Sequence, residues 1–397
     1  MGLRKKRNLI FLRDVLTLTL TAFGGPQAHM ALYLRILVEK RAYLTEAELI
    51  ELHALCQILP GPTSTQTITA LGFKRGGASL AFLTLLVWTL PAVTLMTAFG
   101  ITAGYFQKYG LDFSFTRFIQ PMAIGFVSYA AYKIARKVVT TKTAFSLMIV
   151  AAIVSYFYRA PWGFPIILLV SGLVSGLKFR QQEKEQKERF QIEWSNFFLW
   201  VGVAVGAAVL GGLTQSLPIR LFENFYRNGS LIFGGGQVLI PVLLTEFVEF
   251  KNYLSEEQFL SGYAMVQAVP GPVFSFSAYV GALALPQNSE MFNSIGGGIF
   301  GGLIAAAGIF LPGTFLIFFV IRFWNQLKHY RLVRASLEGI NGASSGLVIT
   351  GAILLAEPLD PSYLNVLLGI GTFLALMFTK IPPPIIIGTG LLLGFIL

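Results

Sequence analysis

The sequence predicts an all-α polytopic membrane protein that contains two inverted-topology repeats with broken or re-entrant helical hairpins. Three observations predict this class. With 54% hydrophobic and only 12% charged residues, a chain of 397 residues cannot cover a water-soluble globule with charge. Two stretches that lie 210 positions apart are nearly the same, and their basic flanks are distributed in opposite ways.

Long apolar runs are the expected membrane spans, because about 20 apolar residues cross a hydrocarbon core of ~30 Å. The first apolar stretch has no small-residue cleavage site and carries Arg13 and Asp14, so we expect it to be retained. The runs 143–157 and 163–177 are short, so they can cross the membrane only together with flanking residues. The expected spans are 77–106, 143–157, 163–177, 197–217, 296–321 and 363–378.

The repeat consists of Phe23–Pro62, which begins FGGPQ and ends LPGP, and Phe233–Pro272, which begins FGGGQ and ends VPGP. Aligned without gaps, 15 of 40 positions are identical, which indicates an internal duplication. Farther along, Pro91 matches Pro312 at an offset of 221, so the second copy has an insertion of 11 residues, expected within 283–298. The identical pairs include Gln27 and Gln237, Glu39 and Glu249, Tyr43 and Tyr253, and Gln57 and Gln267.

Lys and Arg at the ends of the apolar runs predict how the copies are oriented. The flanks of the first copy are basic, as at 4–7 and 40–41, whereas the loop 246–257 of the second copy is acidic. The remaining loop reverses this, since 322–334 carries more cations than 108–117. Because basic loops stay in the cytoplasm, we expect the copies to be inserted upside down relative to each other, with a cytoplasmic N-terminus, in the cytoplasmic membrane. The net charge of +11 does not indicate a nucleic-acid partner, because most Lys and Arg residues lie at the ends of apolar runs.

Four parts follow from the repeat and the charges. Residues 1–142 are the expected first repeat, and 143–217 are connecting transmembrane segments with a charged cytoplasmic loop at 178–193. Residues 218–357 are the expected second, inverted repeat, and 358–397 form a C-terminal transmembrane hairpin. Inverted repeats are typical of secondary transporters, which bind their substrate near the bilayer midplane where discontinuous helices meet.

The repeated glycines and prolines predict helix breaks at the tips of hairpins that enter the membrane. Proline lacks an N–H group and clashes with the preceding turn, so PGP ends one half-helix and starts another. Free amides at a new helix start, together with the hydroxyls of TSTQT at 63–67, favour a small anion. Donors without fixed cations suit a multiply negative oxyanion that must be both bound and released. The candidate substrate-binding residues are Gly24, Gly25, Pro26, Gln27, Gln57, Gly61, Thr63, Ser64, Thr65, Gln66, Gly234, Gly235, Gly236, Gln237, Gln267, Gly271 and Ser275.

Each candidate also has a purely structural interpretation. The PGP breaks can be kinks that shape helix packing, the hydroxyls of 63–67 can bond to helix carbonyls, and the glutamines can join helices. His29, Glu39 and Glu249 are candidates for proton coupling, with packing of His29 and capping or loop pairing of the glutamates as the alternatives. Small residues four apart, such as Gly297 and Gly301, predict close helix packing and also allow a homodimer.

The sequence offers no catalytic or metal-binding set. Cys56 is the single cysteine and there are 3 histidines, so neither a disulfide framework nor a metal or cofactor is expected. A nucleotide fingerprint and a Walker motif are also missing, which argues against an enzyme and against direct use of ATP. A passive anion channel that uses the same helix starts stays an alternative to a transporter.

Two motifs occur once in each copy. They read FGGPQAHMALYLRILVEKRAYLTEAEL and QILPGPTSTQTITALGF in the first copy, and FGGGQVLIPVLLTEFV and QAVPGPVFSFSAYVGAL in the second. The pairs resemble the signature motifs of the chromate transporter family, in its long form with two homologous domains, over residues 8–137 and 218–357. The resemblance implies a protein of the lipid bilayer that exports chromate by a secondary active mechanism and gives chromate resistance. Sulfate or another oxyanion is the alternative substrate.

Overall fold

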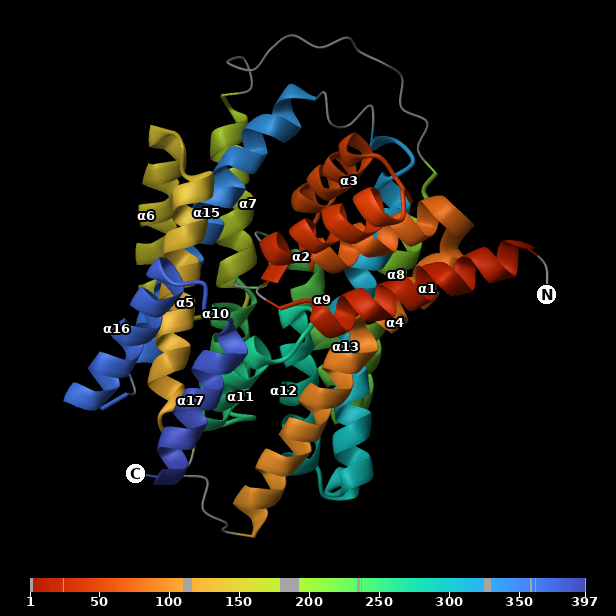
Figure 1. The fold of residues 1–397 in the computed structure, drawn as a ribbon. Helices are drawn as coiled ribbons and strands as arrows, with labels where there is room; N and C mark the ends of the chain where they lie inside the picture. Colours follow the sequence, from red (N-terminus) through yellow and green to blue (C-terminus); the bar gives the residue numbers. More distant parts are fainter. Residues whose placement is uncertain are drawn as a thin grey trace. The chain divides into compact units, whose positions relative to one another are not determined.

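The computed structural model is all-helical, because helices and no strands occur in the residues that it describes (Figure 1). The predicted all-α class is therefore confirmed. The described residues are 3–23, 25–109, 116–178, 193–233, 236, 238–324, 330–357, 359–360 and 362–396.

The chain divides into two compact units, and each unit takes segments from both repeats. Unit 1 comprises Met1–Ile101, Ile192–Ser230 and Val269–Arg322. Unit 2 comprises Thr102–Gln191, Leu231–Ala268 and Phe323–Leu397. Neither unit corresponds to one repeat, so the duplicated halves are interleaved in the fold.

The helices of unit 1 come from the start of the chain and from two later segments. They are α1 (Leu3–Thr21), α2 (Gly25–Tyr33), the π-helix η1 (Leu34–Lys40), α3 (Glu46–Ile58), α4 (Thr63–Lys108, in this unit as far as Ile101), α8 (Ser195–Thr214), α9 (Leu217–Leu231), η5 (Val273–Ser275), α12 (Phe276–Gln287), η6 (Glu290–Phe292) and α13 (Ile295–Val320). The helices of unit 2 are α5 (Ile119–Val138), α6 (Lys142–Phe157), α7 (Gly163–Gly176), α10 (Leu239–Leu243), the π-helix η4 (Leu244–Phe250), α11 (Glu256–Ala268), α15 (Arg331–Ala356), α16 (Tyr363–Phe378) and α17 (Pro383–Ile396).

Within the described residues, 4 helices are long and apolar enough to cross a membrane: α4, α8, α13 and α15. Shorter apolar helices include α6, α7 and α16, which coincide with the shorter runs expected from the sequence. Several apolar helices in one chain make it a multi-pass membrane protein.

The duplication recurs in the backbone at fixed offsets. The π-helices η1 and η4 lie 210 positions apart, as do α3 and α11. The backbone φ angles agree too, since Ala42 and Asn252 have +48° and +52°, and Gly61 and Gly271 have +113° and +123°. Two helix pairs that the sequence did not match also recur, since α6 and α16 lie 221 apart and α7 and α17 lie 220 apart.

Capping boxes start the matching helices α3 and α11. The Thr45 hydroxyl accepts from the Glu48 amide at 3.2 Å, and the Glu48 carboxylate accepts from the Thr45 amide at 2.8 Å. Ser255 and Gln258 make the same pair of bonds in the second repeat, at 3.2 and 2.9 Å. Each box satisfies backbone N–H groups that a helix start leaves without partners.

The chain reverses three times in the first half of unit 1. Asp14, in the middle of α1, binds Arg41 at 2.7 Å, so η1 returns alongside α1 after the first break. Lys74 lies 4.0 Å from Glu48, so the start of α4 runs back along α3 after the PGP break. A third reversal occurs inside α4 at Gly76–Gly77, where Gly77 has a φ of +74° that favours glycine.

In unit 2, α15 is the central helix and packs beside α6 and α7 through small residues (Figure 1). A Cβ added at Gly342 would lie 2.6 Å from the carbonyl oxygen of Ala144 on α6. The Ser155 hydroxyl on α6 also donates to Thr350 of α15 at 2.9 Å. Close backbone approach of this kind is how membrane helices associate without a hydrophobic driving force.

Some sequence predictions fall outside the described residues. Gly24, Gly234, Gly235 and Gln237 are among them, as is most of the charged loop at 178–193. The side chains of Pro26 and Gln27 are outside the description as well.

Candidate functional site

Three of the predicted helix breaks meet in unit 1 at the carbonyl oxygen of Ala22. This oxygen accepts a hydrogen bond from the Gly271 amide at 2.8 Å and another from His29 Nε2 at 3.1 Å. His29 Nδ1 lies 3.0 Å from the hydroxyl of Ser64. The first break, the start of α4 and the second PGP corner are therefore joined by one chain of hydrogen bonds. Gly236, at the fourth break, lies in unit 2.

His29 makes hydrogen bonds through both ring nitrogens. The Ala22 carbonyl can only accept, so Nε2 carries a proton, and Nδ1 contacts the Ser64 hydroxyl. The ring is 1% exposed. Both ring nitrogens are thus engaged inside the protein, which favours a packing role over proton coupling.

Each PGP corner packs against the long helix of the other repeat. A Cβ added at Gly61 would lie 2.9 Å from Gln66 Nε2 and 3.5 Å from the backbone of Gly313 on α13. A Cβ added at Gly271 would lie 2.9 Å from the Cβ of Ala92 on α4. Ala92 and Gly313 directly follow the matched prolines Pro91 and Pro312. The left-handed φ and the lack of space both require glycine at these corners.

Hydrogen bonds separate the TSTQT side chains into two groups, and the first group bonds to the protein itself. Gln66 donates from Nε2 to the Pro60 carbonyl at 2.7 Å, and Thr67 donates to the Thr63 carbonyl at 2.8 Å. Ser64 contacts His29. Of these three, only Thr67 makes the hydroxyl-to-helix-carbonyl bond of the structural interpretation, whereas Ser64 and Gln66 bond to residues on the other side of a helix break.

The second group has donors that the protein does not use. The hydroxyl of Thr63 makes no hydrogen bond to any residue that the structure describes, and Thr65 Oγ1 only accepts, from Trp88 Nε1 at 3.2 Å. The Ser275 hydroxyl, which matches Thr65 in the second repeat, is fully buried and lacks a partner within the described part of the chain. The Gln66 amide makes the first intrahelical bond of α4, to Pro62, so the amides of 63–65 precede the helix ladder.

Trp88 and Tyr33 are two site residues that the sequence reasoning missed. Trp88 is fully buried, lies at 5.3 Å from the His29 ring, and donates its indole N–H to Thr65. The Tyr33 hydroxyl donates to the Ser64 carbonyl at 3.1 Å. The available signal was a tryptophan inside an apolar run, since a buried indole N–H normally has a partner.

The paired glutamines and glutamates lie in different surroundings in the two repeats. Gln57 is exposed and contacts His53 at 3.1 Å, and Glu39 is exposed on η1. Gln267 lies in unit 2, where its Nε2 is buried without a partner among the described residues. Glu249 on η4 forms an ion pair with Arg159 at 3.3 Å.

Arg159 and three glutamates line a cavity of about 220 Å³ in unit 2: Glu249, Glu256 and Glu357. Arg159 lies 2.9 Å from Glu357, just beyond the end of α15. A hydrogen bond from Tyr156 lowers the pKa of Glu357, and Arg159 lowers that pKa further, while burial opposes both effects. The second carboxylate oxygen of Glu249 is buried without a partner in the described part of the chain. Within the described residues, no group of three or more His, Cys, Asp or Glu side chains could hold a metal ion.

The family model described as Chromate transporter matches residues 9–177 and 219–395. The chain belongs to the chromate transporter family. Both matched segments run past the repeat ends expected at 142 and 357, and they take in α6, α7, α16 and α17. The resemblance to the chromate transporter family that the sequence motifs indicated is confirmed.

Curated relatives of the family match nearly the whole chain. A chromate transport protein of Cupriavidus metallidurans is 24% identical over 94% of this chain and 89% of its own. A probable chromate transport protein of Synechococcus elongatus is 26% identical over 94% and 91%. An uncharacterised transporter of Methanocaldococcus jannaschii is 24% identical over 99% and 96%. No solved structure matches the chain.

Proposed function

We propose that this chain is a secondary active transporter that exports chromate across the cytoplasmic membrane and thereby gives chromate resistance. Two observations carry the proposal: three helix breaks are joined by one chain of hydrogen bonds, and donors directly after two of them, at Thr63, Thr65 and Ser275, are not used by the protein. The names of the relatives from C. metallidurans and S. elongatus support chromate as the substrate.

The donor set suits a tetrahedral dianion. Amides at the start of α4 and neutral hydroxyls stabilise negative charge without forming a permanent ion pair, so the anion can also leave. Thr63 and Thr65 are 9% and 1% exposed, so substrate must enter through a local separation of the packed corners. Ser64 and Gln66 were also candidate substrate-binding residues, but their side chains bond within the protein. In this proposal they position the helix break at the start of α4.

The membrane topology belongs to the same proposal. We place the N-terminus in the cytoplasm, the FGG and PGP breaks at re-entrant tips, and the two repeats in opposite orientations. One candidate span, α8, lies between the matched segments 9–177 and 219–395. If each segment crosses the membrane an even number of times, a single linking span inverts the second segment.

Glu249 is the better candidate than Glu39 for proton coupling. It lines the cavity at Arg159, and one of its oxygens lacks a partner in the described residues, whereas Glu39 is exposed on η1. Protonation of Glu249 would weaken its ion pair with Arg159, which supplies a physical link between proton binding and structure.

The deciding experiment is chromate uptake into everted membrane vesicles with and without an imposed proton gradient. If chromate accumulates inside the vesicles above its external concentration, and only when the proton gradient is present, the result supports active transport. Uptake that stops at equal concentrations contradicts active transport and indicates a passive channel. Equal inhibition by equimolar sulfate would show that the site does not prefer chromate.

A further inference from the structure

A second cavity in unit 2, of about 320 Å³, is unrelated to the candidate site. It lies among α5, the segment that follows α15, and α16. Most of its lining is apolar, including Ile124, Leu359, Ile370 and Phe373. Asp360 is the one ionisable side chain among the described residues that line it.

Glycines on two neighbouring helices form part of the cavity wall. Gly125 of α5 packs so closely on α16 that an added Cβ would lie 2.5 Å from the carbonyl oxygen of Gly369 and 2.7 Å from Thr372. Gly125 and Gly369 both line the cavity. The close contact at these glycines therefore holds the two helices together beside the cavity.

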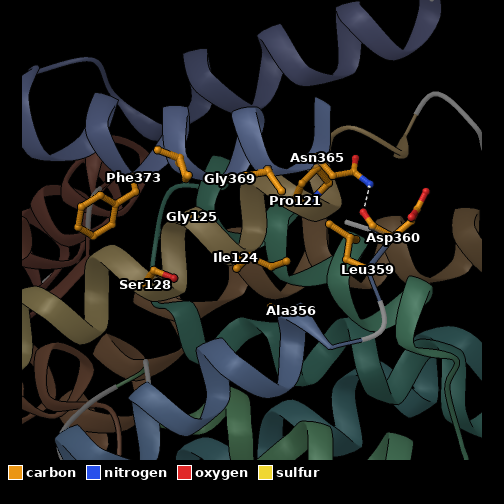
Figure 2. A pocket seen from close by; sticks show the side chains of 12 residues that line it. Pro121, Ile124, Gly125, Ser128, Ala356, Leu359, Asp360, Asn365, Gly369 and Phe373 are labelled. Atoms are coloured by element: carbon orange, nitrogen blue, oxygen red, sulfur yellow. Dashed lines mark hydrogen bonds between the residues drawn. The ribbon is translucent and has the colours of Figure 1, made fainter. Parts of the chain in front are cut away.

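The cavity carries a charge at one end and is mostly apolar elsewhere. Figure 2 shows Asp360 and Asn365 together at one end, with Phe373 and Ser128 at the opposite end. The Asn365 side chain donates to the main-chain oxygen of Asp360 at 2.9 Å, as the dashed line marks. Asn365 is thus engaged, and the Asp360 carboxylate supplies the charge at the polar end.

The helix that forms one wall is exposed along its apolar side. Leu367 is 68% exposed, Ile370 is 56% exposed and Phe378 is 74% exposed. In a multi-pass membrane protein, exposed apolar side chains on a peripheral helix face lipid. The cavity therefore lies beside a lipid-facing helix, where an acyl chain can reach it.

We propose that this cavity binds one acyl chain of a phospholipid whose protonated amine headgroup pairs with Asp360. The apolar end buries the chain, which is favourable for each methylene group removed from the polar boundary. The carboxylate attracts an ammonium group and repels an anionic headgroup, so the charge selects the lipid class. The proposal does not depend on the transported substrate.

Native mass spectrometry of the purified full-length protein tests this binding. The protein is incubated with equimolar phosphatidylethanolamine and phosphatidylglycerol that carry the same chains. We expect the wild type to retain phosphatidylethanolamine over phosphatidylglycerol by about fivefold, the ratio that an accessible ion pair can supply. Equal retention of the two lipids would overturn the proposal.

Three variants separate the headgroup from the chain. Asp360→Asn should remove the preference and leave total lipid retention unchanged, whereas Asp360→Glu should keep the preference. Ser128→Phe should fill the apolar end and lower retention of both lipids. The proposal fails if Asp360→Asn keeps the preference, and that test stands even if Ser128→Phe does not fold.

Discussion

The cations that follow the two π-helices, Arg41 and Lys251, occupy matching positions, but their carboxylate partners come from different helices. Arg41 follows η1 and binds Asp14 of α1 at 2.7 Å, and the Tyr43 hydroxyl donates to the same carboxylate at 2.5 Å. Burial raises the pKa of Tyr43 to about 12, and its hydrogen bond to Asp14 adds to this, so the hydroxyl stays protonated. In the second repeat, Lys251 follows η4 and lies 3.4 Å from Glu246, which is part of η4 itself and fully buried.

The exchange is reciprocal in sequence. The position that matches Asp14 is Asn224, and the position that matches Glu246 is Ile36. The first repeat thus ties its π-helix to α1, and both lie in unit 1. The second π-helix carries its own carboxylate and lies in unit 2, whereas α9 belongs to unit 1 as far as Ser230. A cation at low exposure requires a nearby carboxylate. Because Glu246 lies on η4 itself, Lys251 does not need a carboxylate from α9, the helix that matches α1.

The largest expected effect comes from giving η4 the residue of the first repeat. Glu246→Ile removes the carboxylate that lies 3.4 Å from Lys251, whose side chain is 20% exposed. We expect a loss of about 3 kcal/mol in stability, near the low end for breaking a buried ion pair. Thermal unfolding of the purified protein in detergent measures it. An unchanged midpoint would show that Lys251 does not depend on Glu246.

The reverse exchange in the first repeat should cost less. Asp14→Asn removes the ion pair to Arg41 and weakens the bond from Tyr43, but the Arg41 side chain is 41% exposed and solvent can replace part of the interaction. We expect a loss of about 1 to 2 kcal/mol in the same thermal assay. A loss as large as that of Glu246→Ile contradicts the argument from burial.

Transport by variants of the two helix starts shows whether both repeats contribute donors. Thr63→Ala and Ser275→Ala each remove one unused hydroxyl, and we expect each to raise the KM for chromate about tenfold, since a hydrogen bond to a charged group contributes at least ~1.4 kcal/mol. Thr67→Ala is the matched control, because its hydroxyl donates to the Thr63 carbonyl. An effect from Thr63→Ala alone would assign the anion site to the first repeat.

The capping boxes of α3 and α11 should respond alike. Thr45→Ala and Ser255→Ala each remove an N-cap acceptor, and both should lower stability by about 1 kcal/mol. Thermal midpoints of the two variants in detergent provide the comparison. A clear difference between them would mean that the helices do not contribute equally to their units.

The smallest effect is a pH dependence confined to the first capping box. The bond from the Thr45 amide lowers the pKa of Glu48, and the Thr45 hydroxyl lowers it further. A lowered pKa means that the stabilisation is present above the unfolded value of 4.5 and is lost as pH falls through the folded value. Glu48→Gln, which copies Gln258, should therefore differ from wild type by less than about 1 kcal/mol at pH 7, and the difference should shrink as pH falls below 4.5. Thermal midpoints between pH 3 and 7, measured on both proteins, decide it.

Helix breaks and helix starts were predictable because they depend on local chemistry. PGP cannot continue a helix, and a threonine or serine followed three residues later by Glu or Gln starts one, whatever surrounds it. The 15 identities over 40 positions were enough to show the duplication. The π-helices η1 and η4 were not predicted, because their hydrogen-bond register depends on packing around the segment.

The all-helical class, the duplication, the positions of the breaks and the residue types gathered there follow from the sequence. Folding determines that Ser64 and Gln66 bond within the protein while Thr63 and Ser275 keep unused hydroxyls, and that Glu246, not the residue matching Asp14, pairs with Lys251. The physical reason is that backbone breaks follow from single residues, whereas a hydrogen-bond partner or a counter-ion is chosen among side chains that only folding brings together.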